Sequence, residues 1–140
     1  MIILAIDYGD ARTGLAVCGK DEIMASPVGT IAETDKNRLC EKILSVIEEY
    51  RAEMLVLGLP KNMDGSEGFR AEAVREFGEL LKEKSGLPLE YSDERLTTVS
   101  AHNYLNNTNT RGKKRKNIVD TVSAVIILDD FLRKRKLANL

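Results

Sequence analysis

Two short apolar runs constrain the fold of this chain more than any other feature of its sequence. Ile2 to Ile6 and Met54 to Gly58 are apolar at every position or nearly so, and several of the side chains are branched. A strand with one wet face alternates apolar and polar residues, so an unbroken apolar run indicates a strand buried on both faces. Such strands lie inside a sheet that carries helices on its faces. The sequence therefore predicts an α/β fold.

Changes in the spacing of apolar residues along the chain predict where the strands and helices lie. They predict, in chain order, strands at 2–6, 15–18 and 23–31, a helix at 36–50, a strand at 54–58, a helix at 69–84, a strand at 89–91 and helices at 96–105 and 117–135. The first three strands are expected to form an antiparallel meander, and the strand–helix–strand alternation requires parallel crossovers. We predict a mixed five-stranded sheet with flanking helices, in one domain spanning residues 1–140. Residues 106–112 show no period and are expected to form a mobile loop.

Composition favours a soluble protein of a reducing compartment. No apolar run approaches the roughly 20 residues of a membrane-spanning helix, and the N-terminus lacks the pattern of a signal peptide. The two cysteines, Cys18 and Cys40, have no metal-ligand spacing and are expected to be buried thiols. We therefore expect a cytoplasmic protein that does not contact membranes.

Two acidic residues follow predicted strands. Asp7 ends the first apolar run, and Glu94 follows the short strand at 89–91. A carboxylate at the end of a buried strand lies at the sheet rim, partly removed from water. Each acid also has an ordinary structural explanation. Asp7 can start an Asx-turn, and Ser92 or Asp93 can cap the next helix with Glu94 in its first turn, against the helix dipole. Arg95 can orient the Glu94 carboxylate or contact a phosphate.

Asp120 is the most informative acid because it lies in an apolar helix. It shares a helical stripe with Ala124, Ile127 and Phe131, at spacings that bring all four to one face. A carboxylate on a buried face is costly unless it is paired or binds a cation. The alternative is a capping box, with Asn117 as the N-cap and Asp120 three residues later.

Together the three acids suggest a metal centre. If their strands are parallel, Asp7 and Glu94 reach the same sheet edge, and the last helix can lay Asp120 across it. Converging carboxylates repel one another without a counter-charge, which Mg²⁺ or Mn²⁺ supplies as a hard, oxygen-preferring cation. His102 is the only histidine and is expected on a helix surface. Two such ions, roughly 4 Å apart, can activate water and stabilise the leaving oxygen of a phosphodiester.

Charge is distributed unevenly along the chain. The net charge is −1, yet the segment from residue 111 onward has nine basic and three acidic residues, which makes it +6 and the first 110 residues −7. The basic residues just before Asp120 are expected to form a loop that brings phosphates to the metal site: Arg111, Lys113, Lys114, Arg115 and Lys116. Arg133 to Lys136 is expected to be a solvated helix end whose cations oppose the helix dipole.

Four motifs resemble the YqgF family of Holliday-junction-resolvase-like proteins, which have a ribonuclease H-like fold. They are Asp7-x-Gly9-x-x-Arg12-x-Gly14, Gly58-Leu59-Pro60-x-Asn62-Met63-Asp64-Gly65-x-x-Gly68-x-Arg70-Ala71, Asp93-Glu94-Arg95-Leu96-Thr97-Thr98, and Asp120 with the apolar helix after it. The second is long and specific, and the match covers nearly the whole chain. The resemblance implies that Asp7, Glu94 and Asp120 coordinate metal, with Arg12 among the residues near nucleic acid.

The resemblance also implies a substrate, without deciding between two. Members are linked to maturation of the small-subunit ribosomal RNA precursor, and are described as resolving branched DNA by analogy with RuvC-type resolvases. We predict a nuclease that processes pre-16S ribosomal RNA ends, as a monomer or homodimer that acts on structured RNA and ribosome precursors. The alternatives are a Holliday junction resolvase, a non-catalytic module that binds structured nucleic acid, and an actin-like ATPase half.

The second motif suggests a further site loop. Asn62, Asp64 and Gly65 follow a predicted parallel strand at the edge where ligands collect in open α/β sheets. The alternative is a tight glycine turn that contacts no ligand. Tyr8, Tyr91 and Tyr104 are the aromatic residues expected near the site, where core or rim packing is the alternative to base stacking.

Overall fold

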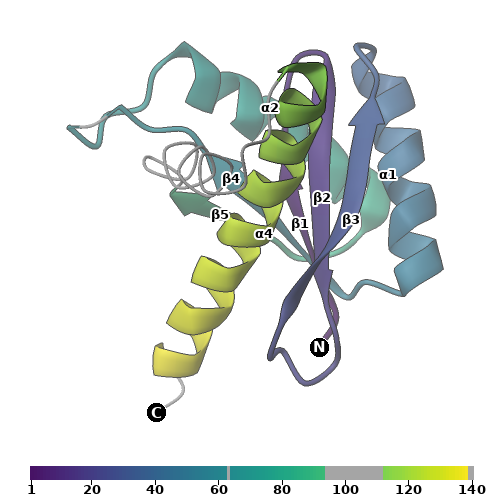
Figure 1. Cartoon of the computed structure of the whole chain (residues 1–140), viewed down its shortest axis with the longest axis vertical. Helices are drawn as coiled ribbons and strands as arrows, with labels where there is room; N and C mark the ends of the chain where they lie inside the picture. Colours follow the sequence, from purple (N-terminus) through teal and green to yellow (C-terminus); the bar gives the residue numbers. More distant parts are fainter. Residues whose placement is uncertain (63, 94–111, 139–140) are drawn as a thin grey trace.

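The computed structural model is built on a five-stranded sheet with the strand order β3-β2-β1-β4-β5 (Figure 1). It describes residues 1–62, 64–93 and 112–138, with 112–121 as main chain only. The elements are β1 (Ile3–Asp7), β2 (Arg12–Cys18), β3 (Ala25–Ala32), α1 (Lys36–Tyr50), β4 (Met54–Leu59), α2 (Phe69–Ser85), β5 (Leu89–Asp93) and α4 (Gly112–Ala138). Within these ranges no helix is both long and apolar enough to cross a bilayer.

The sheet combines an antiparallel and a parallel half, as predicted. β1 pairs antiparallel with β2, and β2 with β3, which gives the expected meander. β1 pairs parallel with β4, and β4 with β5. The carboxyl ends of β1, β4 and β5 therefore lie along one edge of the sheet, where the connecting segments carry the polar residues of interest.

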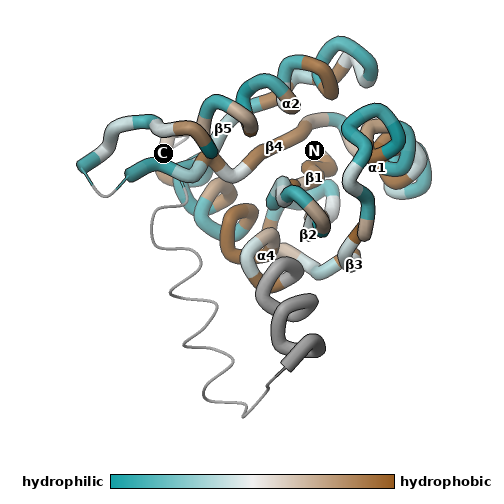
Figure 2. Tube along the Cα trace, turned by 90° about the horizontal axis from the view of Figure 1, so that it is seen from above, coloured by the Kyte–Doolittle hydropathy of each residue, from teal (hydrophilic) through white to brown (hydrophobic). Residues whose placement is uncertain are grey.

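Alternate residues of β1 face two separate cores. Leu4 and Ile6 face the layer formed by α1 and α2, and Ile3 and Ala5 face α4. All four side chains are fully buried. Figure 2 shows the brown apolar segments gathered between the sheet and its helices. Burial on both faces explains the unbroken apolar run of β1, because neither set of alternate positions meets water.

Strand β3 is irregular, as its proline predicts. Pro27 pairs with Ala16 of β2, and the register between the two strands shifts at Leu15 and Ala16. Gly29 has a φ of +140°, which a residue with a Cβ rarely adopts. β3 is an edge strand of the sheet, and a missing main-chain donor is tolerated there because none of the described strands pairs with its outer side.

Helix bounds agree with the sequence prediction at α1 and differ at α4. Asp35 caps α1 by accepting hydrogen bonds from the main-chain N–H groups of Asn37 and Arg38, at 2.9 and 3.1 Å. The α4 prediction was wrong at its start, because the helix begins at Gly112 and not at residue 117. Lysine and arginine are good helix formers, so the basic run joins the helix. The helix predicted at 96–105 lies outside the described residues.

Candidate functional site

Two acidic positions end parallel strands at the carboxyl edge of the sheet, on either side of β4. Asp7 is the last residue of β1, and Asp93 is the last residue of β5. In the register of the sheet, Ile6 lies beside Leu57 of β4, and Leu59 lies beside Asp93. The chain leaves β5 at this edge towards Glu94, which lies outside the described residues. The predicted topology of Asp7 and of the strand before Glu94 is therefore confirmed.

A tight turn follows Asp7 and returns the chain into β2. The Gly9 main-chain N–H donates to Oγ1 of Thr13 at 3.4 Å, and Thr13 is fully buried. A Cβ at Gly9 would clash with the main-chain carbonyl oxygen of Arg12. Only glycine fits this close approach without movement of the backbone. The glycine of the first motif thus fixes the path of the chain directly after Asp7.

Helix α2 holds the same turn through two contacts. The Tyr8 ring stacks on Phe77, with centroids 4.3 Å apart and planes 6° apart. Arg70 donates from Nη2 to the Tyr8 carbonyl oxygen at 3.3 Å and from Nη1 to the Asp10 carboxylate at 3.0 Å. Burial, and next the charge of Asp10, raise the pKa of the Tyr8 hydroxyl. Tyr8 is therefore a core residue and not a base-stacking platform.

Arg70 had no role assigned from the sequence, although it lies in the second motif. Its two partners are 60 and 62 residues away in the chain, so no local pattern could reveal them. The one available signal was the motif itself, in which Arg70 follows Gly68 at the start of a helix.

The loop after β4 is a closed turn that bonds its own polar groups. The Asn62 side-chain amide donates to Oγ of Ser66 at 3.0 Å, and that hydroxyl donates to Asp64 at 2.6 Å. Gly65 has a φ of +91° and donates its N–H to the Asn62 carbonyl oxygen at 2.9 Å. These bonds support the tight glycine turn. A role for Asn62, Asp64 and Gly65 in ligand contact stays a prediction.

Helix α4 crosses the opposite face of the sheet and carries Asp120. Ala124, Ile127 and Phe131, which define the stripe predicted to include Asp120, are all buried against β1, β2 and β4. The capping alternative for Asp120 is wrong, because Asn117 lies five residues inside a helix that begins at Gly112. Capping at residue 117 would need non-helical dihedral angles there.

The basic segment before Asp120 is also placed differently from its prediction. Lys113, Lys114, Arg115 and Lys116 belong to the first turns of α4 and not to a loop. Arg111 and Arg95 lie outside the described residues, whereas Arg12 begins β2 at the same sheet edge as Asp7.

Glu94 and the side chain of Asp120 fall outside the described part, so the three-carboxylate centre stays a prediction. Among the described residues, no three histidine, cysteine or acidic side chains gather closely enough to hold a metal ion.

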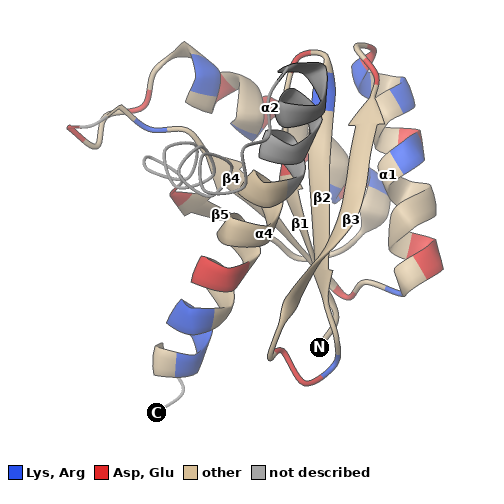
Figure 3. Ribbon diagram, viewed as in Figure 1, with Lys and Arg blue, Asp and Glu red and all other residues tan. Residues whose placement is uncertain are grey.

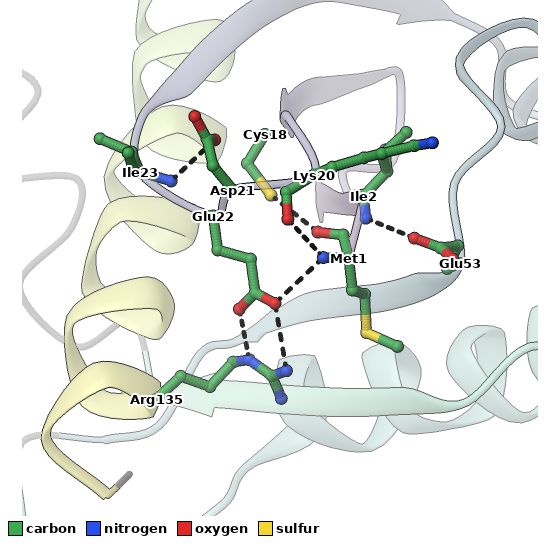
Figure 4. Close-up of polar contacts among 9 residues, drawn as sticks. All are labelled: Met1, Ile2, Cys18, Lys20, Asp21, Glu22, Ile23, Glu53 and Arg135. Atoms are coloured by element: carbon green, nitrogen blue, oxygen red, sulfur yellow. Dashed lines mark hydrogen bonds and ion pairs between the residues drawn. The ribbon is translucent and has the colours of Figure 1, made fainter. Parts of the chain in front are cut away.

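A polar cluster closes the other end of the sheet (Figure 4). Arg135 of α4 donates to both carboxylate oxygens of Glu22, from Nε at 2.8 Å and from Nη2 at 3.4 Å. The Met1 amino group donates to the same carboxylate at 3.2 Å. The Arg135 hydrogen bond lowers the pKa of Glu22. Met1 precedes β1 and Asp7 ends it, so Arg135 lies far from the candidate site. Arg133 to Lys136 was predicted to be a solvated helix end, whereas the Arg135 side chain is paired with Glu22.

Figure 3 marks the acidic and basic positions along the ribbon. A shallow groove along α2 is lined by Gly68, Phe69, Arg75 and four glutamates, Glu67, Glu72, Glu76 and Glu79. Arg75, the one cation in the lining, donates to both carboxylate oxygens of Glu67, at 2.6 and 2.8 Å. The remaining carboxylates would repel a polyanion, so this groove does not suit a phosphate backbone.

Comparisons with known proteins agree with the predicted fold and family. The Thermus thermophilus RuvC structure is similar, with a TM-score of 0.58 at 14% identity over 97% of this chain and 96% of that one. The fowlpox virus Holliday junction resolvase has a TM-score of 0.57 at 10% identity, over 96% and 99%. At these identities the likeness shows the fold, and it confirms the ribonuclease H-like class.

Sequence relatives extend over nearly the whole chain. A Lactococcus lactis subsp. cremoris protein named "Putative pre-16S rRNA nuclease" is 42% identical over 93% of this chain and 92% of its own length. A Streptomyces avermitilis protein of the same name is 38% identical over 97% and 88%. The family model described as RuvX, Holliday junction resolvase, matches residues 1–134. These relatives confirm the predicted nuclease class and the predicted resemblance to the YqgF family, and the chain belongs to this family, whose model is described as RuvX.

Proposed function

We propose that this protein is a metal-dependent nuclease that processes the ends of pre-16S ribosomal RNA in the cytoplasm. The observation that carries the proposal is the position of Asp7 at the carboxyl edge of the parallel strands, the same edge at which β5 ends before Glu94. Whole-length relatives named for pre-16S ribosomal RNA give the substrate. The buried free cysteines, Cys18 and Cys40, fit a reducing compartment.

Asp7, Glu94 and Asp120 would hold Mg²⁺ or Mn²⁺, in a site for two ions. Carboxylate oxygens are the donors that these hard cations prefer, and Asp7 lies at the rim, where a carboxylate can face both the protein and a substrate. When bound, the cations would supply Lewis-acid stabilisation of the negative charge that develops on the phosphodiester oxygens. The protein would contribute by holding the carboxylates on strand ends and on α4, so that these side chains need not rearrange during the reaction.

Basic side chains near this edge would bind the phosphate backbone. Arg12 begins β2 at the site edge, and the lysines at the start of α4 precede Asp120 by one to two turns. Each phosphate that they neutralise releases counterions, so binding should weaken steeply as salt rises. Arg95 and Arg111 complete the proposed set of nucleic-acid contacts.

Resolution of Holliday junctions is a second candidate, favoured by the family match and by the fold shared with RuvC. The Thermus thermophilus RuvC solved with a Holliday junction substrate has a TM-score of 0.61 to this chain at 12% identity. A junction resolvase requires a symmetric dimer to cut two strands, whereas trimming an RNA end does not. A third candidate is a module that binds structured nucleic acid without cleaving it.

A cleavage assay with matched substrates tests these candidates. Precursor 16S ribosomal RNA with extended ends and a four-way DNA junction are each incubated with wild type and with Asp7→Asn, in Mg²⁺ and in Mn²⁺. We expect RNA cleavage that falls by more than about 100-fold in Asp7→Asn, because a metal centre contributes several kcal/mol to the barrier. Asp130→Asn, which removes a carboxylate at the far end of α4, is the matched control and should cleave normally.

The outcomes separate the three candidates. Cleavage of the junction with the RNA left intact supports resolvase activity, and the protein should then be a dimer by light scattering. If wild type binds one of the substrates but cuts neither of them, in Mg²⁺ or in Mn²⁺, the nuclease proposal is wrong. That result supports a module that binds structured nucleic acid without cleaving it.

A further inference from the structure

Arg70 has two partners of different kind at the candidate site edge. Nη2 donates to the main-chain carbonyl oxygen of Tyr8 at 3.3 Å, and Nη1 donates to the carboxylate of Asp10 at 3.0 Å. We propose that Arg70 binds a phosphate of the substrate backbone, and that Asp10 occupies this phosphate position until the substrate replaces it. This inference rests on the proposed function, because the phosphate would belong to the nucleic acid bound at the sheet edge where Asp7 ends β1.

Asp10 has the properties of a replaceable partner. Its side chain is 86% exposed, and the Arg70 side chain is 45% exposed, so water and substrate reach both groups. An ion pair this exposed adds little to stability, because water screens the charges and two flexible side chains must be held in place. The exchange of one oxygen anion for another therefore costs little.

The other half of the guanidinium is held in place. Its bond to Tyr8 is part-buried, and the Tyr8 ring stacks on the fully buried Phe77. Arg70 would thus keep its position when Asp10 leaves. The planar guanidinium presents paired N–H donors that match phosphate oxygens.

The location suits a phosphate next to the reacting one. Tyr8 directly follows Asp7, so Arg70 contacts the peptide group that begins the turn after the proposed metal ligand. Arg70 is also the second residue of α2, where the helix dipole adds positive potential that favours an anion. A purely structural role, in which the Arg70–Asp10 pair only holds the turn, makes the opposite prediction for Asp10 variants.

Binding of a labelled RNA tests the proposal without cleavage. Fluorescence anisotropy is measured with a single-stranded fragment of the 16S precursor in EDTA, at several salt concentrations. We expect Asp10→Asn to bind up to about fivefold more tightly than wild type, since an exposed competing ion pair is lost. Arg70→Gln should bind on the order of tenfold more weakly, with a salt slope smaller by about 0.7. Arg70→Lys should lie between, because it keeps the charge without the paired donors.

Two controls separate this effect from a general change of charge. Asp130→Asn breaks another exposed ion pair, with Lys134 at 3.0 Å, and raises the net charge equally at the far end of α4. It should leave binding unchanged. In an Arg70→Gln background, Asp10→Asn should no longer tighten binding. The proposal is overturned if Asp10→Asn binds RNA no better than wild type, if Asp130→Asn tightens it equally, or if the gain persists without Arg70.

The binding assay and the cleavage assay can refute their two proposals independently of each other. If the protein cuts no nucleic acid but Asp10→Asn still tightens RNA binding, the nuclease proposal fails and the phosphate contact at Arg70 stands. If cleavage depends on Asp7 and Asp10→Asn has no effect on binding, the reverse holds.

Discussion

Gly78 of α2 offers a stability prediction whose sign depends on one neighbour. A glycine inside a helix costs about 1 kcal/mol relative to alanine, so Gly78→Ala would ordinarily stabilise the protein. In this structure a Cβ at Gly78 would overlap the Tyr91 hydroxyl and lie 3.0 Å from two ring carbons of that residue. The ring is held by its hydroxyl, which donates to the Arg75 carbonyl oxygen at 3.3 Å, and by the Arg75 guanidinium 4.9 Å above its centre.

Overpacking of this kind typically lowers the free energy of unfolding by about 1–3 kcal/mol, and we take the middle of this range, about 2 kcal/mol. Set against the gain of about 1 kcal/mol from helix propensity, Gly78→Ala should destabilise the wild-type protein by about 1 kcal/mol. In a Tyr91→Ala background the ring is gone, and the same substitution should stabilise by about 1 kcal/mol. The coupling energy between the two sites is therefore about 2 kcal/mol.

Urea unfolding followed by circular dichroism, on the four proteins of this double-mutant cycle, measures the coupling. Thermal unfolding should show the same reversal, at about 3 °C per kcal/mol for a chain of this length. The argument is refuted if Gly78→Ala raises the unfolding midpoint with Tyr91 present. Tyr91 lies two residues before Asp93, so the contact also bears on how firmly α2 holds the strand that leads into Glu94.

Three further predictions concern the turn after Asp7, the Glu22–Arg135 pair and the two buried cysteines. Gly9→Ala should lower both stability and cleavage, because the new Cβ meets the fixed carbonyl group of Arg12; a normal urea midpoint with full activity would contradict this. Glu22→Gln should destabilise the protein at neutral pH. Arg135 lowers the pKa of Glu22 from its usual 4.5. The extra stability of wild type over Glu22→Gln is therefore present above pH 4.5 and should vanish as the pH falls well below it. Chemical unfolding from pH 7 to pH 3 measures this difference, and a difference that does not change with pH would refute the prediction. Burial raises the pKa of both cysteines, so a thiol reagent should label neither in the folded protein at pH 7, and rapid labelling would show that the packing is looser.

Local sequence signals sufficed for most of the sheet and for α1. The unbroken apolar run of β1 reflects burial on both faces, and the helical spacing of apolar residues from Leu39 onward predicted α1. Pro27, which has no main-chain donor, is typical of an irregular edge strand such as β3. These features are local, since each depends on neighbours within one strand or one helical turn.

Interactions between distant segments could not be predicted from the sequence. The bond from Arg70 to Tyr8 needs the packing of α2 on the sheet, and no spacing within either segment reveals it. The start of α4 was misplaced for a different reason. A run of four basic residues looks solvated and loop-like, and Asn117 resembles a cap, yet the helix continues through both. Intrinsic helix propensity of lysine and arginine prevailed over the capping preference of asparagine.

The continuous course of α4 has a mechanical consequence for its acid. The helix is locked in rotation by Ala124, Ile127 and Phe131, which are packed on the sheet, and it runs unbroken back to residue 120. The position of residue 120 around the helix axis is therefore fixed by that packing and not by its own neighbours in the sequence. Each residue turns the helix by about 100°. One alanine inserted between Thr121 and Val122 would therefore rotate position 120 by about a quarter turn relative to Ala124, Ile127 and Phe131, which would keep their contacts with the sheet.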